Sequence, residues 1–146
     1  MKSDTRILFI EDDPNDVELV MGQLKLAKLD PHVKVITDGR AAIRYLTNEK
    51  TECESLVIVF LDLKLPFVSG IKVLETIRAD DRLQHLPVMV MTSSNNPADL
   101  EKCLELGVTH FLPKPITFPV FAKAVADCIH YRPVESSIEM SSGMDD

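Results

Sequence analysis

The sequence predicts an α/β fold, in which helices cover both faces of a parallel five-stranded sheet. Five short apolar runs alternate along the chain with five segments whose apolar residues recur at helical spacing. The runs are apolar along their whole length rather than at every second position, which is typical of strands buried on both faces. Alternation of this kind produces a parallel sheet with right-handed crossover connections.

The strands are predicted from runs rich in β-branched residues that are bounded by polar residues or proline. The run Leu-Val-Ile-Val-Phe-Leu at 56–61 is the most apolar, and we expect it to be the central strand. An acidic segment, 11–16, ends the first strand, and Thr37-Asp38-Gly39 ends the second. In chain order the strands are predicted at 6–10, 33–36, 56–61, 87–91 and 109–112.

The helices are predicted where apolar residues recur every three or four positions. The fourth helix has signals at both ends, because Asn96 suits the N-cap, Pro97 the first position and Gly107 the C-terminal stop. In chain order the helices are predicted at about 17–27, 41–46, 71–77, 97–106 and 118–129, with polar connections at 47–55 and 79–86. Residues 1–131 are predicted to form one domain, followed by a polar tail at 132–146.

Composition and charge exclude several classes of function. No apolar run approaches the ~18 residues that a membrane helix needs, and residues 1–6 are too polar for a signal peptide. We therefore expect a cytoplasmic protein. The net charge of -7 and the pI near 5.0 argue against nucleic-acid binding. Cys53, Cys103 and Cys128 lack a CxxC spacing and are expected to be reduced filler residues.

Polar side chains are predicted at the carboxyl ends of the strands, where folds of this class bind ligands. Glu11 and Asp12 follow the first strand, Asp62 the third, Thr92 the fourth, and Lys114 lies in the loop after the fifth. Three carboxylates this close repel one another, so at least one carboxyl pKa should rise unless a cation lies among them.

Carboxylate oxygens suit Mg²⁺, and a hydroxyl with an ammonium group completes a site for phosphoryl transfer. Each residue alone has a simpler interpretation, such as a solvated turn, a helix cap or a surface lysine. Their coincidence at the ends of the correct strands favours a functional site.

Several motifs in order resemble the receiver domains of two-component response regulators. They are Ile7–Asp13, Leu61–Pro66 followed by Gly70, Met91–Ser93, and Lys114-Pro115. The resemblance covers about residues 5 to 130 and implies a flavodoxin-like, doubly wound sheet with strand order 2-1-3-4-5. The connection 79–87 and the run Thr92-Ser93-Ser94 are similar to the small regulators paired with bacterial phytochromes.

The resemblance implies a phosphoacceptor and a metal site. Asp62 matches the residue that accepts the phosphoryl group. Asp12, Asp62 and the backbone carbonyl of Lys64 match ligands of Mg²⁺, and Glu11 matches a ligand that binds directly or through water. The Lys64 side chain is therefore free to vary.

The resemblance also implies partners for the phosphoryl group. Thr92, with Ser93, would hydrogen-bond its oxygens, and Lys114 would pair with Asp62 before transfer and with the phosphoryl group afterwards. Phe111 matches the aromatic switch residue that turns inward as Thr92 moves, with a permanently buried core ring as the alternative. The Lys114–Pro115 peptide bond is expected to be cis.

The implied function is that of a single-domain response regulator. It would accept a phosphoryl group from a sensor histidine kinase, with a bacterial phytochrome as one candidate, or from a phosphotransfer protein. Since only 15 residues follow Tyr131, we expect output through a changed protein-binding surface, including a homodimer through the last helix and strand. We do not expect an enzyme with a diffusible substrate, although such a domain assists its own phosphorylation and dephosphorylation.

Other classes of protein fit the sequence less well. An aspartyl-phosphate hydrolase has a second Asp two positions after the nucleophile, where this chain has Lys64. A flavin-binding sheet has a phosphate-cradling loop after the first strand, where this chain is acidic. A receiver-like binding module that works without phosphorylation would be expected to lack one of Asp12, Asp62 or Lys114, and all three are present.

Overall fold

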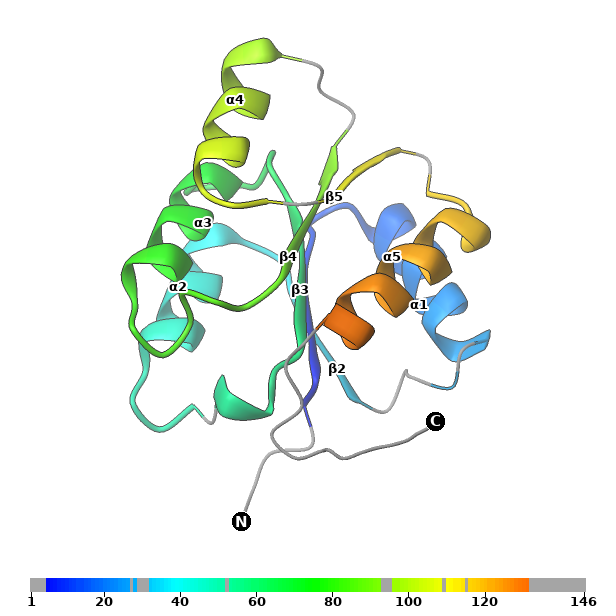
Figure 1. Cartoon of the computed structure of the whole chain (residues 1–146), viewed down its shortest axis with the longest axis horizontal. Coiled ribbons are helices and arrows are strands. Elements are labelled where there is room, and N and C mark those ends of the chain that lie inside the picture. The colour runs from blue at the N-terminus through cyan, green and yellow to red at the C-terminus, as the bar shows by residue number, and fades with distance from the viewer. Residues whose placement is uncertain are drawn as a thin grey trace.

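The fold is a single parallel sheet of five strands in the order β2-β1-β3-β4-β5 (Figure 1). The computed structural model describes residues 5–26, 28, 32–51, 53–92, 96–108, 110–114 and 116–131. The strands are β1 (Ile7–Ile10), β2 (Val33–Ile36), β3 (Ile58–Asp62), β4 (Val88–Thr92) and β5 (His110–Pro113). The predicted fold class and strand order are both confirmed.

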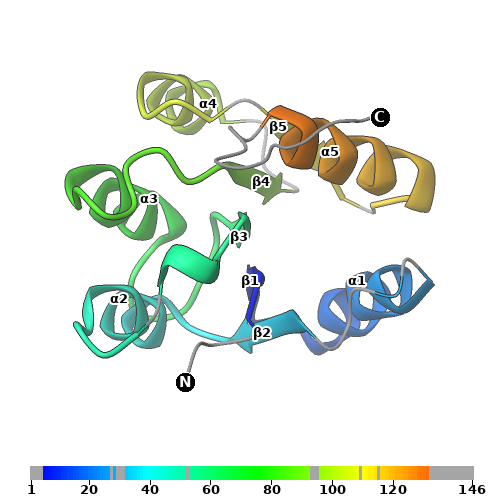
Figure 2. The same ribbon diagram turned by 60° about the horizontal axis from the view of Figure 1, so that its bottom comes forward.

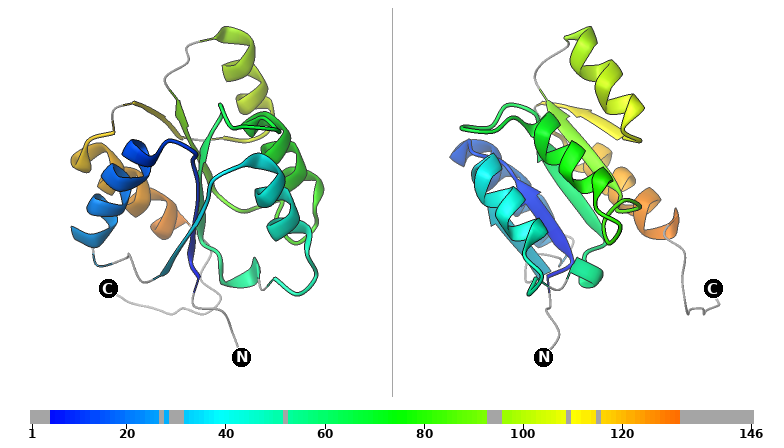
Figure 3. Two further views of the ribbon diagram at one scale, coloured as in Figure 1. Left: turned by 180° about the vertical axis from the view of Figure 1, so that it is seen from behind. Right: turned by 90° about the vertical axis from the view of Figure 1, so that its left-hand side faces the viewer.

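Helices cover both faces of the sheet. They are α1 (Pro14–Leu26), α2 (Gly39–Thr47), α3 (Gly70–Ala79), α4 (Pro97–Glu105) and α5 (Phe118–Tyr131), with a short 3-10 helix, η2 (Cys53–Ser55), after α2. Figure 2 shows α1 and α5 on one side of the sheet and α2, α3 and α4 on the other. The same grouping is visible from behind in Figure 3. In the part of the chain that the structure describes, no helix is both long and apolar enough to cross a membrane.

Two hydrophobic cores lie on the two faces of the sheet, because successive side chains of a strand point in opposite directions. From β1, Ile7 and Phe9 pack into the core beneath α1 and α5, whereas Leu8 and Ile10 pack into the core beneath α2 and α3. Every residue of β1, β3 and β4 is buried. Burial on both faces explains why these runs are apolar throughout.

Three strands end about one residue later than their apolar runs predict. Asp62, Thr92 and Pro113 are the last residues of β3, β4 and β5 rather than the residues that follow them. The reason is that the hydrogen-bonded ladder continues past the apolar run. Asp62 pairs with Met91, and Thr92 pairs with Pro113.

Helix caps explain where the helices differ from their predicted limits. Asp38 caps α2 by accepting a hydrogen bond from the Ala41 amide at 2.7 Å, so the helix begins at Gly39 rather than at Ala41. A side chain at Gly39 would place its Cβ 2.1 Å from the Val68 carbonyl oxygen. The predicted cap of α4 is confirmed, since the Asn96 side chain accepts from the Ala98 amide at 2.9 Å.

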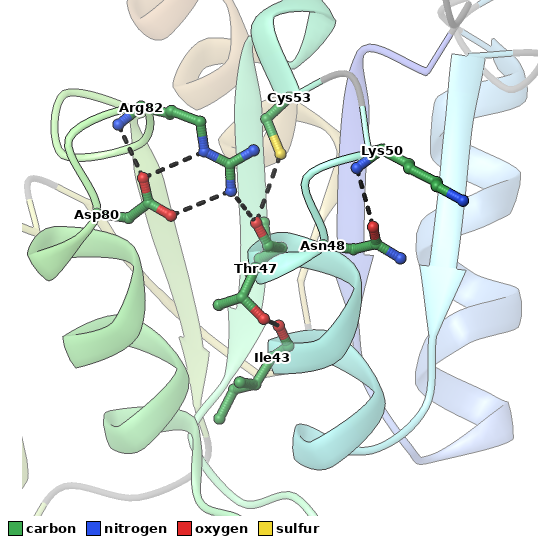
Figure 4. Close-up of polar contacts among 8 residues, drawn as sticks. Ile43, Thr47, Asn48, Lys50, Cys53, Asp80 and Arg82 are labelled. Atoms are coloured by element: carbon green, nitrogen blue, oxygen red, sulfur yellow. Dashed lines mark hydrogen bonds and ion pairs between the residues drawn. The ribbon is translucent and has the colours of Figure 1, made fainter.

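The C-terminal end of α2 is closed by residues from two later segments (Figure 4). The Arg82 guanidinium donates to the Leu46 carbonyl at 2.7 Å, and the Cys53 thiol lies 3.7 Å from the same oxygen. Asp80 holds Arg82 through an ion pair at 3.1 Å. Cationic donors at this end of a helix satisfy carbonyls that have no partner within the helix.

Arg78 joins the predicted polar connection 79–86 to the turn after α4. Its guanidinium donates to the carbonyls of Leu106 at 2.6 Å, Leu86 at 2.7 Å and Gln84 at 3.1 Å. Burial lowers the pKa of Arg78 from its ordinary value. The connection is therefore more ordered than its polar composition suggests, and it is anchored by a half-buried cation.

Candidate functional site

Three carboxylates gather at the carboxyl edge of the sheet, the upper edge in Figure 1. Because Ile10 pairs with Leu61, the residues that follow them, Glu11 and Asp62, lie level with each other. One oxygen each from Glu11, Asp12 and Asp62 lies within 4.8 Å of the others. Glu11 and Asp62 are buried, whereas Asp12 is exposed. The trio therefore has two acids below the surface and one facing solvent.

Lys114 reaches this cluster from the loop after β5. Its Nζ lies 2.8 Å from a Glu11 carboxylate oxygen and 3.1 Å from one of Asp62. Its backbone amide donates to the Thr92 carbonyl at 3.2 Å, which ties the lysine to the end of β4. The structure thus brings Lys114 together with two of the predicted acids, as the positions at the strand ends suggest.

A fourth acid, Asp16, also holds Lys114, and the sequence analysis did not identify it. Its Oδ2 accepts a hydrogen bond from Lys114 Nζ at 2.8 Å. Asp16 lies in the first turn of α1, which begins at Pro14 behind an Asp13 cap that accepts from the Asn15 amide at 2.9 Å. The sequence does contain a signal for this contact. Asp13 followed by Pro14 is typical of a helix start, and a helix that begins at Pro14 includes Asp16 in its first turn.

The electrostatics of the cluster follow from its burial. Burial, together with the neighbouring Asp62 carboxylate, raises the pKa of Glu11 to about 7, against an opposing effect of Lys114. Burial alone would lower the pKa of Lys114, but its contacts with Asp16, Glu11 and Asp62 outweigh burial and raise it. The lysine therefore stays charged, and the predicted rise in a carboxyl pKa is confirmed at Glu11.

The remaining predicted residues surround Asp62. Thr92 is buried at the end of β4, one residue beyond the partner of Asp62. The Lys64 amide donates to an Asp62 carboxylate oxygen at 3.1 Å, and the Lys64 side chain is exposed. Phe111 is half-buried on β5 and packs against the core beneath α2 and α3.

Gly70 approaches the phosphoacceptor candidate so closely that only glycine fits. A Cβ at Gly70 would lie 2.4 Å from the Asp62 carbonyl oxygen, and the Gly70 amide donates to the Leu63 carbonyl at 2.9 Å. This explains the glycine in the motif that follows the third strand. Ser93, Ser94 and Pro115, with the expected cis peptide, lie outside the described residues, as does the tail at 132–146.

The donor set fits a hard divalent cation. All three clustered ligands offer carboxylate oxygen, which Mg²⁺ prefers, and the exposed Asp12 leaves the cluster open to water. Three carboxylates contact the Lys114 ammonium group, and Asp12 lies beside two of them, so the site carries excess negative charge when the acids are ionised. A cation among the acids would remove that excess.

Comparison with known protein families identifies the family of this chain. The family described as the response regulator receiver domain matches residues 7–126. The chain belongs to this family. As a receiver domain it takes part in two-component signalling, which was the function implied by its motifs.

Proteins similar to this receiver domain include a bacteriophytochrome response regulator. It is 35% identical over 111 residues to the response regulator Rcp1 of Synechocystis sp., covering 74% of this chain and 75% of Rcp1. The structure of the bacteriophytochrome response regulator RtBRR is similar with a TM-score of 0.74 and 37% identity, covering 89% of this chain and 81% of RtBRR. The expected likeness to regulators of bacterial phytochromes is confirmed.

A metal-bound relative is also known. The Mn²⁺-bound form of Rcp1 has a TM-score of 0.71 and 29% identity with this chain, covering 93% of this chain and 99% of that structure.

Proposed function

We propose that this receiver domain accepts a phosphoryl group on Asp62 in a reaction that requires Mg²⁺. The observation that carries the proposal is the position of the Asp62 carboxylate, which is buried, contacts Lys114 at 3.1 Å and shares a cluster of oxygens with Glu11 and Asp12. The manganese-bound form of the related Rcp1 supports a divalent cation at such a cluster. The donor would be a phosphohistidine on a sensor histidine kinase, such as a bacterial phytochrome, or on a phosphotransfer protein.

Each residue of the site would have a separate role in phosphoryl transfer. Glu11, Asp12 and Asp62, with the Lys64 carbonyl, would hold Mg²⁺, which supplies positive charge to the oxygens of the transferring group. An Asp62 oxygen forms the new bond to phosphorus as the bond from phosphorus to the donor histidine breaks, which leaves an acyl phosphate on Asp62. Lys114 stays within reach of the product.

The signal would pass from Thr92 to the neighbouring α4, β5 and α5. The acyl phosphate adds about -1.5 to -2 charge and three acceptor oxygens. The Thr92 hydroxyl, with Ser93, would donate to one of these oxygens, and Phe111 would turn inward as that loop moves. Such a local electrostatic change is the usual trigger of a two-state surface change.

We further propose that the output is a protein contact, including a homodimer through α5 and β5, and not a reaction on a diffusible substrate. Leu104 on α4 and Val120 on α5 expose 63% and 47% of their surface, which supports an apolar contact there. Val108, which lies between α4 and β5, is buried in the core and does not add to this surface. The side chains of Phe118 and Phe121 lie outside the description. The domain limits 1–131, the tail from 132 and a cytoplasmic location belong to the same proposal.

Incubation with acetyl phosphate and Mg²⁺, followed by intact mass spectrometry, tests the proposal. We expect the parent protein to gain one phosphoryl group, and we expect the gain to disappear with a chelator or in Asp62→Asn. If the folded parent binds Mg²⁺ and gains no phosphoryl group, the alternative holds, and the chain is a receiver-like binding module that works without phosphorylation.

A further inference from the structure

Asp16 forms one of the two shortest contacts of Lys114, yet it lies outside the carboxylate trio that can hold a metal. We infer that Asp16 is a positioning residue that holds the Lys114 ammonium beside the metal site, so that the lysine does not depend only on the acids that would bind the cation. The inference rests on the proposed Mg²⁺ dependence.

The geometry shows a competition for carboxylates. An ammonium group has three N–H donors, and in this structure three carboxylates surround Nζ, those of Glu11, Asp16 and Asp62. Two of the three belong to the metal-binding trio, and Asp16 does not. When a cation also binds those two acids, Asp16 is the one of the three partners that Lys114 does not share with it.

The charges predict what happens without Asp16. A divalent cation and the ammonium group repel each other at a separation of a few ångströms, and they share two partners in a half-buried site. Without Asp16, Lys114 would depend on Glu11 and Asp62 alone and would resist the cation more strongly. Asp16 therefore favours metal binding through its effect on where the lysine lies.

The position of Asp16 is fixed by α1, since its side chain is 27% exposed and lies in the capped first turn. Seven residues later on the same face of the helix, the buried Gln23 donates from Nε2 to the Ile116 carbonyl at 2.9 Å. Thus α1 contacts the loop of Lys114 at two points, one through the lysine side chain and one through the backbone. The second contact ties the same helix to the main chain two residues after Lys114.

Calorimetric titration with Mg²⁺ tests the inference in four variants of the full chain. Partners outside the metal's own ligands commonly change metal affinity by about 10- to 100-fold, so we expect Asp16→Asn to weaken Mg²⁺ binding about tenfold. Glu18→Gln is the matched control, because it removes the same charge from an exposed position of the same helix. In a Lys114→Met background, the further change Asp16→Asn should alter the affinity by less than about twofold, since the lysine through which Asp16 acts is absent.

A second measurement separates positioning from damage to the fold. The rate of phosphorylation of Asp16→Asn by acetyl phosphate should recover when Mg²⁺ is raised to saturation, and Asp16→Glu should recover part of the affinity. Unchanged Mg²⁺ affinity in Asp16→Asn would overturn the inference, as would an equal loss in the Lys114→Met background. If the folded parent binds no Mg²⁺, then the proposed function fails together with the inference.

Discussion

Replacing Glu11 by Gln should remove a pH dependence from the stability of the metal-free protein. Glu11 is fully buried, and its pKa is raised from 4.5 to about 7. Between these two values the folded protein binds more protons than the unfolded chain. The contribution of Glu11 to the free energy of unfolding is therefore greatest below pH 4.5 and is lost as the pH rises through about 7.

The size of the effect follows from the two pKa values. Each pH unit between them removes about 1.4 kcal/mol, so the loss between pH 4 and pH 8 is on the order of 3 kcal/mol. The Gln side chain stays neutral at every pH and does not suffer this loss, although it also gives up the ion pair with Lys114. We expect Glu11→Gln to match the parent near pH 5 and to exceed it by about 2 kcal/mol at pH 8.

Urea unfolding followed by circular dichroism, in the presence of a chelator at pH 5, 6, 7 and 8, measures the difference. Glu18→Gln serves as the control for general effects of charge, since Glu18 is exposed on α1. A difference between Glu11→Gln and the parent that stays constant with pH would refute the reasoning. Adding Mg²⁺ at pH 8 should stabilise the parent by mass action and Glu11→Gln much less, because the variant has lost a ligand.

Three further substitutions test the contacts that support the site. Gly70→Ala should destabilise the fold by about 1–3 kcal/mol and weaken Mg²⁺ binding, because its Cβ would overlap the Asp62 carbonyl; unchanged Mg²⁺ titration would contradict this. Gln23→Met should lower the free energy of unfolding in urea by about 1–2 kcal/mol, because the Ile116 carbonyl loses a buried donor. An unchanged urea midpoint would show that this contact does not stabilise the fold. Arg78→Met deprives three carbonyls of a charged donor, so we expect the free energy of unfolding to fall by about 3 kcal/mol in the same assay. A fall of less than about 1 kcal/mol would contradict this prediction.

The fold and the main acids could be predicted because both depend on simple periodic patterns. Apolar runs mark the strands, and parallel strands bring their carboxyl ends to one edge of the sheet. Glu11, Asp12 and Asp62 meet for that reason. The predicted strand limits were about one residue early because the apolar pattern ends before the backbone ladder does, as the pairing of Thr92 with Pro113 shows.

The contacts of Asp16 and Arg78 could not be predicted from such patterns. Asp16 stands in an acidic run that composition alone assigns to a solvated turn, and only the early start of α1 turns its carboxylate toward Lys114. Arg78 contacts backbone carbonyls rather than side chains, so no residue type in the sequence marks its partners. Interactions of both kinds depend on loops that are packed together only in the folded chain.

The charge imbalance of the metal-free site has a consequence for the proposed phosphorylation. A phosphoryl group would add negative charge where Lys114 is the only cation that the described residues bring into contact with Asp62. The lysine would have to shift toward the new oxygens, and its backbone amide is bonded to the Thr92 carbonyl at 3.2 Å. This hydrogen bond would link a shift of the lysine to a shift of Thr92. Since α1 contacts the lysine through Asp16 and the loop through Gln23, the helix that follows the acidic residues would restrain that shift from the opposite side.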